Sequence, residues 1–430
     1  MITIPTAHEG ARDTPRFRRL IAVFLFGFSS GLPYGLVSSS LQAWYAVSHL
    51  SIMAVGMLSL VVQPYSYKFL WAPLMERFGI RGLGRWRGWI AVTQVGLVAG
   101  IFWISYFSPI EHPLWMAMFA VGIAFLSASQ DIVIDAYRLE LLPEQERGLG
   151  VAWAVLGYRL AILVGGAFAL VMAQYIGWQL TYQIMAGAMF VGVIANFYAP
   201  NIEVRLDPNQ LSFSFYTTMV MPFASFLKRP HSSLFILFIL LYKLGTAFTS
   251  STSGVLIPFL IQGLGFSLAT VGVVNKVGGL VAMILGSFVA GFFMLRMSLF
   301  RALLYFGITQ AVANIFFIVL AFSGKSVSLL WWAILADNFS AGMGIAALLA
   351  LMMSLCDKNF IATQFAVLSA VSMLPFMLSG PLAAWVASTW GWGSLYIGAF
   401  LASLPALFLL YYGLQRPITE CSSHGRGVIG

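Results

Sequence analysis

Long apolar runs alternate along the chain with short segments that carry most of the polar residues. A helix needs about 20 apolar residues to cross the hydrocarbon core of a bilayer. The runs lack the strict alternation of membrane β-strands, and they are far too long for strands of about ten residues. The pattern therefore predicts an all-α membrane protein with 12 transmembrane helices, at 19–44, 52–75, 89–107, 114–139, 148–174, 178–199, 232–262, 267–294, 299–322, 328–354, 360–388 and 393–414.

The composition agrees with a multispanning membrane protein. Of the 430 residues, 60% are hydrophobic and only 9% are charged, whereas a soluble domain carries about 25% charged residues. The net charge of +9 raises the question of nucleic acid. The basic residues are not gathered into one face or arm, so we expect the lipid bilayer and no nucleic acid as a partner.

The basic residues fall on one side of the predicted spans. By the positive-inside rule that side is cytoplasmic, which places both termini in the cytoplasm. The opposite side carries only Lys325. The cytoplasmic set is Arg12, Arg16, Arg18, Arg19, Arg77, Arg81, Arg85, Arg87, Arg147, Arg205, Lys228, Arg229, Arg296, Arg301 and Lys358.

Two halves of the chain repeat one another on either side of a polar stretch at 200–230. The segment 51–56 (SIMAVG) recurs as 267–272 (SLATVG), and 177–182 (GWQLTY) recurs as 391–396 (GWGSLY), at nearly the same spacing. We predict a six-helix half at 1–199, a cytoplasmic linker at 200–230, a second six-helix half at 231–414 and a cytoplasmic tail at 415–430. Parallel halves with a cavity between them are typical of major facilitators.

Seven ionisable residues fall inside the predicted spans. Leaving all seven in lipid would cost on the order of 20 kcal/mol, so their side chains must be paired or hydrated inside the bundle. None has an ionisable mate at the matching position of the other half, so the shared architecture does not require them. They are either structural ion pairs or groups that act in transport: Lys68, Asp131, Asp135, Arg159, Lys243, Lys276 and Asp337.

The signs of these charges suggest separate roles. Asp131 and Asp135 lie one helical turn apart on one face, and such an acid pair can exchange protons with water. Arg138, about one turn further along, can compete for either carboxylate. Asp337 is isolated, and it faces the lysines of spans 7 and 8 only if the cavity brings them together. The cations outnumber the acids, which favours an anionic substrate; they are Lys68, Arg159, Lys243 and Lys276.

The loop after the second span carries Glu76 and the arginines Arg77, Arg85 and Arg87. It is similar to the loop between helices 2 and 3 of major facilitators, where an acid and several arginines hold helix ends in one conformation. We therefore predict a gating role for these four residues, with Glu in place of the more usual Asp.

The remaining motifs predict packing or exclude other chemistry. Gly27, Gly31 and Gly35 recur every four residues, which predicts close helix packing. The segment 324–326 (GKS) lacks the first glycine of a phosphate loop, so ATP-driven transport has no support. The histidines have no metal-ligand spacing. We expect no enzyme, no metal and no cofactor, with a proton gradient as the driving force.

Several segments resemble the AmpG-type muropeptide permeases, a family of major facilitators. They occur in family order at 68–75, 130–136, 146–148, 157–160, 271–276, 299–304 and 362–366. The resemblance implies proton-coupled import of a small anionic glycopeptide, GlcNAc–1,6-anhydro-MurNAc with or without stem peptides. The protein would lie in the Gram-negative inner membrane, where we expect a monomer. Its substrate would serve peptidoglycan recycling and signal β-lactamase induction.

The resemblance also implies roles for individual residues. Asp131 and Asp135 become candidates for proton coupling. At position 337 the family more usually has Glu. The predicted substrate-binding residues are Lys68, Arg159 and Lys276, with Tyr158 and Asn275 from the same segments and with the intramembrane residues Lys243 and Asp337.

Two other functions stay open at this point. The first is a proton-coupled carrier of another anionic amphiphile, such as an acyl-CoA. The second is a membrane sensor that binds muropeptides without moving them, although such a sensor needs no intramembrane acid pair. An integral-membrane enzyme lacks a nucleophile–histidine or metal constellation in this sequence.

Overall fold

The structure is a computed structural model that describes residues 14–72, 75, 85–200, 226–227, 231–250, 254–356 and 361–415. Within these ranges helices and their connecting turns account for the chain, and no strand occurs. The predicted all-α class is confirmed. Of the described helices, nine are long and apolar enough to cross a membrane, while Ile52–Tyr67 and Ser232–Ala247 are shorter apolar helices. The number 12 stays a prediction.

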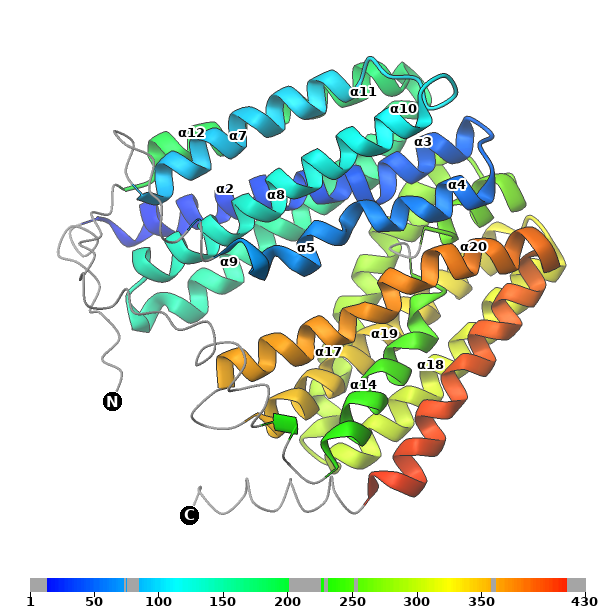
Figure 1. The fold of residues 1–430 in the computed structure, drawn as a ribbon. Coiled ribbons are helices and arrows are strands. Elements are labelled where there is room, and N and C mark those ends of the chain that lie inside the picture. Colours follow the sequence, from blue (N-terminus) through cyan, green and yellow to red (C-terminus); the bar gives the residue numbers. More distant parts are fainter. Residues whose placement is uncertain are drawn as a thin grey trace, which may run out of the picture. The chain divides into compact units, whose positions relative to one another are not determined.

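The chain forms two compact units. Unit 1 comprises Met1–Leu50, Leu58–Leu206 and Ser267–Gly272, and unit 2 comprises Ser51–Met57, Asp207–Phe266 and Val273–Gly430. The helices of unit 1 are α2 (Arg16–Gly35), η1 (Leu36–Ser40), α3 (Leu41–Val47), η2 (Leu58–Val62), α5 (Gln63–Tyr67), η3 (Lys68–Leu70), α7 (Arg85–Ile104), α8 (Pro113–Leu141), α9 (Glu144–Leu163), η4 (Val164–Phe168), α10 (Ala169–Ile176), α11 (Trp178–Ala188), α12 (Phe190–Tyr198) and α16 (Leu268–Val271) (Figure 1).

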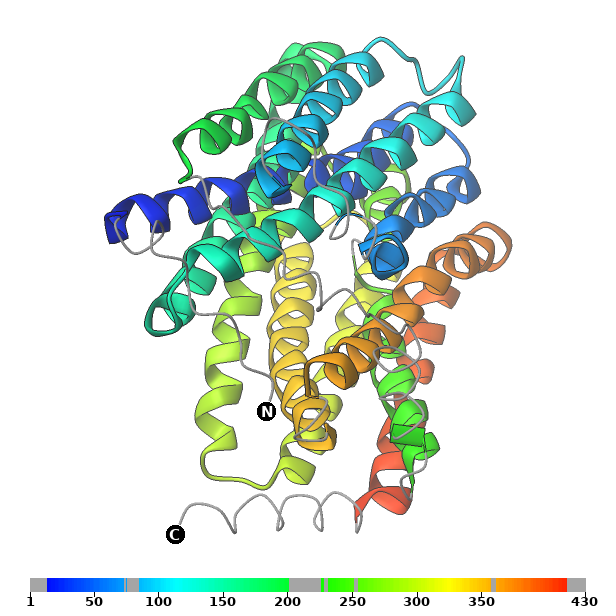
Figure 2. The ribbon, with the colours of Figure 1, turned by 60° about the vertical axis from the view of Figure 1, so that its left-hand side comes forward.

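Unit 2 contains the remaining helices, with a core of phenylalanine and aliphatic side chains centred on Phe238, Phe306 and Leu351. Figure 2 shows two of these helices, α17 in lime and α19 in yellow, side by side. The helices are α4 (Ile52–Met57), α14 (Ser232–Ala247), α15 (Leu256–Pro258), η8 (Phe259–Gly263), most of η9 (Gly272–Gly278), α17 (Gly279–Met294), α18 (Leu299–Ser323), α19 (Val327–Leu355), α20 (Ile361–Phe408) and η10 (Leu409–Gly413).

The repeated glycines mark equivalent turns in the two units. Gly177 (φ 81°) separates α10 from α11, and Gly391 (φ 83°) breaks the long stretch α20 into two helical parts. Such positive φ values favour glycine because it has no Cβ. The break falls between the spans predicted at 360–388 and 393–414, and it explains why the sequence repeat keeps this glycine.

Close glycine contacts hold the paired helices of each unit. In unit 1, a Cβ added to Gly27 or Gly31 would lie less than 3.0 Å from backbone atoms of α9, so α2 and α9 touch along their backbones. The predicted packing role of these glycines is confirmed. In unit 2, Gly286 of α17 and Gly342 of α19 meet the backbone of the opposite helix in the same way.

The repeat formed by 51–56 and 267–272 is exchanged between the units. Each copy belongs to the unit that is built mainly from the other half of the chain. Gly56 of α4 lies in unit 2, against Ala384 of α20. Gly272, its mate in the repeat, lies in unit 1 against Ala167. Nearly all of the predicted linker 200–230 lies outside the described residues.

Candidate functional site

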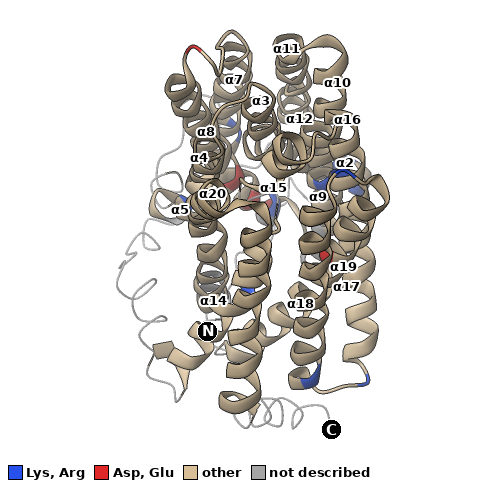
Figure 3. Cartoon of the chain, turned by 90° about the vertical axis from the view of Figure 1, so that its right-hand side faces the viewer, with Lys and Arg blue, Asp and Glu red and all other residues tan. Residues whose placement is uncertain are grey.

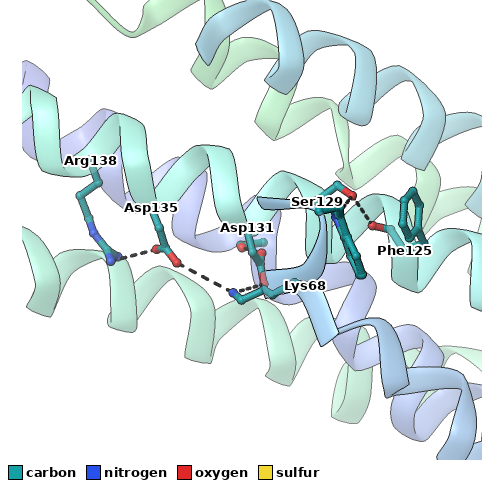
Figure 4. A network of polar contacts seen from close by, with 8 residues as sticks. Lys68, Phe125, Ser129, Asp131, Asp135 and Arg138 are labelled. Carbon is teal, nitrogen blue, oxygen red and sulfur yellow. Dashed lines mark hydrogen bonds and ion pairs between the residues drawn. The ribbon is translucent and has the colours of Figure 1, made fainter. Parts of the chain in front are cut away.

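A chain of four charged side chains lies in unit 1 (Figure 4). The ammonium nitrogen of Lys68 is 4.0 Å from Oδ2 of Asp131 and 4.0 Å from Oδ2 of Asp135. The guanidinium of Arg138 is 2.9 Å from Oδ1 of Asp135. One lysine is therefore shared between two carboxylates, and Arg138 pairs with the outer carboxylate, which is one of the two partners predicted for it.

Two local features bring these charges together. On α8, the spacing of Asp131, Asp135 and Arg138 places all three on one side of the helix. Lys68 comes from the short turn η3, which Trp71 anchors to α8. The indole nitrogen of Trp71 donates to Oγ of Ser129 at 2.9 Å, and its ring lies 4.8 Å from the ring of Phe125.

The two carboxylates have different surroundings. The side chain of Asp131 is 13% exposed, and it accepts a hydrogen bond from Ser30 of α2. The side chain of Asp135 is 52% exposed. A partly buried charge depends on its few partners far more than an exposed one does. Asp131 is therefore the more constrained member of the pair.

Beside this pair lies a cavity of about 270 Å³. Tyr158 and Arg159 of α9 line it together with Ser30 and the two aspartates. No carboxylate among the described residues lies within 4.0 Å of the Arg159 guanidinium. Four of the predicted site residues thus line one cavity in unit 1, namely Asp131, Asp135, Tyr158 and Arg159, and a fifth, Lys68, lies 4.0 Å from both aspartates.

A buried polar cluster in unit 2 surrounds Asp337 of α19. Its Oδ1 accepts hydrogen bonds from Oγ1 of Thr249 at 2.8 Å and from Nε2 of Gln310 at 3.0 Å. Gln310 is oriented in turn by Ser340, whose hydroxyl donates to it at 2.9 Å. Neutral donors hold this carboxylate, and no lysine or arginine of the described residues pairs with it. The conditional pairing with the lysines of spans 7 and 8 does not occur.

The two predicted lysines of unit 2 also lack acidic partners among the residues that the structure describes. Lys243 is 8% exposed, and its nitrogen lies 5.7 Å from the centre of the Phe376 ring. Lys276 and its neighbour Asn275 lie in η9, which is a π-helical segment. Figure 3, in which the charged residues are coloured blue and red, shows that most of the helical chain carries no charge.

The predicted gate is only partly visible. Glu76 and Arg77 lie outside the described residues, as does the side chain of Arg85. Arg87 donates to the backbone oxygen of Asn196 at 2.7 Å, and the Asn196 amide returns a hydrogen bond to the Arg87 oxygen at 3.1 Å. These bonds tie α7 to α12 within unit 1, and the gating role of Arg87 stays a prediction.

Sequence reasoning missed two polar links that the structure brings out. Ser30 had no motif to mark it, because a single serine in a span is unremarkable until its partner is known. From the sequence, Arg19 indicates only the orientation of the spans. It pairs with Glu146, with distances of 2.7 Å from Nη2 to Oε1 and 3.1 Å from Nε to Oε2. This two-bond pair joins the first turns of α2 and α9.

The helical fold and its intramembrane charges define a membrane transporter, and comparison with known proteins identifies its class. A family model described as the Major Facilitator Superfamily matches residues 19–380, and the chain belongs to that superfamily. It is 43% identical over 393 residues to the anhydromuropeptide permease of Escherichia coli strain K12, covering 91% of this chain and 79% of the relative. The resemblance to the AmpG-type permeases is confirmed.

Solved structures of more distant proteins share the fold. A transporter of the POT family superposes with a TM-score of 0.73 at 14% identity, covering 96% of this chain and 100% of its own. The nucleoside transporter NupG superposes with a TM-score of 0.70 at 11% identity, covering 92% of this chain and 99% of its own. At such low identity these likenesses establish the major facilitator fold alone.

Proposed function

We propose that this protein imports anhydro-muropeptides, GlcNAc–1,6-anhydro-MurNAc with or without stem peptides, in symport with protons. The observation that carries the proposal is the 43% identity to an anhydromuropeptide permease along 91% of the chain. The substrate would enter peptidoglycan recycling and report cell-wall damage for β-lactamase induction. We further propose that the protein acts as a monomer in the bacterial inner membrane with both termini in the cytoplasm.

The charge chain of unit 1 supports proton coupling. Lys68 stands 4.0 Å from both Asp131 and Asp135. A proton on either carboxylate removes one of the two negative charges that Lys68 faces, so the lysine then interacts mainly with the other. Proton binding at this pair is therefore linked to the position of a charged side chain, and symport requires such a link.

The cations support an anionic substrate. Arg159, Lys243 and Lys276 have no carboxylate partner among the described residues. A buried cation without a partner is costly. The substrate would supply the missing charge through the lactyl carboxylate when no peptide is attached, or through the carboxylates of the stem peptide. The proposed binding set also includes Asn275 and Asp337.

Transport by purified protein in liposomes tests this proposal. We expect an inward proton gradient to drive accumulation of radiolabelled GlcNAc–1,6-anhydro-MurNAc tripeptide. Asp131→Asn and Asp135→Asn should each lower that accumulation at least tenfold while counterflow exchange without a gradient persists. Glu111→Gln is the matched control, because Glu111 is an exposed acid in a loop between α7 and α8.

Three outcomes would contradict the proposal. Accumulation of an acyl-CoA in place of the muropeptide would favour the other anionic carrier. Muropeptide binding without movement across the membrane would favour a sensor. Gradient-driven accumulation that is equal in wild type and in both aspartate variants would remove the acid pair from proton coupling.

A further inference from the structure

Three tyrosines from three helices of unit 1 lie together beside the charged cavity. The rings of Tyr34 (α2) and Tyr65 (α5) meet edge to face, with their centres 5.1 Å apart and their planes at 88°. The ring of Tyr158 (α9) lies 6.4 Å from that of Tyr34, with the planes tilted by 35°. Tyr158 also lines the cavity together with Asp131 and Asp135, so the tyrosine group lies next to the acid pair.

These tyrosines differ from the structural tyrosines of the same unit. Tyr45, Tyr137 and Tyr182 are each at most 2% exposed, and the hydroxyl of each donates to a backbone oxygen. That pattern is typical of a tyrosine that serves packing. Tyr34, Tyr65 and Tyr158 are all only partly buried. The ring of Tyr34 contacts both others, and Tyr158 lines the cavity.

Charge and aromatic surface meet at Asp131. Asp131 and Tyr158 line the same cavity, and Tyr158 is linked through Tyr34 to Tyr65. An aromatic face beside a carboxylate suits a pyranose ring. The apolar C–H face of the sugar stacks on the ring, while its hydroxyls donate to the acid. A wholly apolar ligand would gain nothing from the carboxylate.

The aromatic group, like the charges, is absent from the repeat. In the register that aligns the two halves, the positions matching Tyr34, Tyr65 and Tyr158 carry Ser250, Val281 and Ser372. The fold therefore does not require tyrosine at these positions. Three tyrosines that occur in only one half of the repeat, and that lie together there, indicate that they bind one ligand.

We propose that Tyr34, Tyr65 and Tyr158 form a sugar subsite that stacks on a pyranose ring of the substrate, with Asp131 accepting its hydroxyls. This assignment rests on the proposed function and adds to it. The subsite would recognise the disaccharide, while the cations would recognise the carboxylates of the peptide. Binding of the sugar at Asp131 would also place substrate in contact with a proton-coupling group.

Equilibrium binding to the purified full-length protein tests the subsite with two probes. One is GlcNAc–1,6-anhydro-MurNAc without peptide, and the other is the free stem tripeptide. We expect Tyr34→Leu and Tyr158→Leu to weaken disaccharide binding at least tenfold and to leave tripeptide binding unchanged. The Phe variants, which keep the ring, should stay within about threefold of wild type. Tyr175→Leu is the control, because Tyr175 is 75% exposed and outside the group.

The controls separate loss of the ring from loss of the fold. Thermal unfolding of each variant is measured first, and Tyr34→Met, whose unbranched side chain adapts to irregular space without a ring, replaces a Leu variant that does not fold. Disaccharide affinity that is equal in wild type and in the ring-deficient variants would overturn the subsite alone. A wild-type protein that binds no muropeptide would instead overturn the proposed function.

Discussion

Two double-mutant cycles will show how Lys68 divides its interaction between two carboxylates. One cycle combines Lys68→Met with Asp131→Asn, and the other combines it with Asp135→Asn. Both carboxylates lie 4.0 Å from the Lys68 nitrogen. Distance alone therefore predicts equal coupling energies in the two cycles. We expect unequal energies, because the surroundings of the two aspartates differ.

The expected magnitudes follow from burial. Two unit charges 4.0 Å apart attract by about 4 kcal/mol at an effective dielectric constant of 20, and screening by water reduces this value. Asp135 is 52% exposed and also pairs with Arg138, so its coupling to Lys68 should fall to about 0.2–1 kcal/mol, as for surface pairs. Asp131 is 13% exposed, and its coupling should be about 1–3 kcal/mol.

The assay is the free energy of unfolding, measured by titration with SDS in mixed micelles for the wild type, the single variants and the two double variants. Far-UV circular dichroism of each variant confirms its helical content before titration. A coupling energy for Asp135 that equals or exceeds that for Asp131 would refute the reasoning from burial. In that case the exposure of each carboxylate would not control its interaction with Lys68.

Two further predictions concern the packing of α2 against α9. Gly31→Ala should destabilise the protein by about 1–3 kcal/mol, because its Cβ would overlap the backbone of α9. Gly122→Ala is the control in the same SDS titration and should have no such effect, because no atom lies within 4 Å of the added Cβ. Equal losses of stability in the two variants would contradict the close contact. Glu146→Gln should lower the stability of the protein by about 1.5–3 kcal/mol, because it weakens the charged pair with Arg19. Glu111→Gln, at an exposed position, should leave the thermal midpoint unchanged. A midpoint unaffected in both variants would show that the pair contributes nothing to stability.

The parts of the fold that depend on local pattern could be predicted from the sequence. Apolar length predicted the helices, since the bilayer sets a minimum length for any span. The glycine repeat of the first span predicted contact with another helix, and α9 proved to be that helix. The Gly177 and Gly391 repeat was visible as a motif. Its physical reason, a positive φ at both turns, appears only in the structure.

The parts of the site that depend on tertiary contacts could not be predicted. Helical spacing places Asp131 and Asp135 on one face, but it does not show that Lys68 is shared between them. The anchor at Trp71 decides that, and it acts through Ser129 of another helix. Likewise, Asp337 was identified as an isolated acid. Its neutral donors come from α18 and from the segment after α14, which are distant in sequence.

The unequal surroundings of Asp131 and Asp135 suggest how one helical turn can link a proton to a sugar. Asp135 is half exposed and can exchange protons with water directly. Asp131 is nearly buried, and Ser30 and Lys68 are the partners that hold it. A proton on Asp131 would remove the charge that holds Lys68 there, and the lysine would turn toward Asp135. A pyranose hydroxyl could then take the place that Lys68 leaves beside Asp131. Proton and sugar would thus favour the same arrangement, as symport requires, and both would act through the single cation that the two acids share.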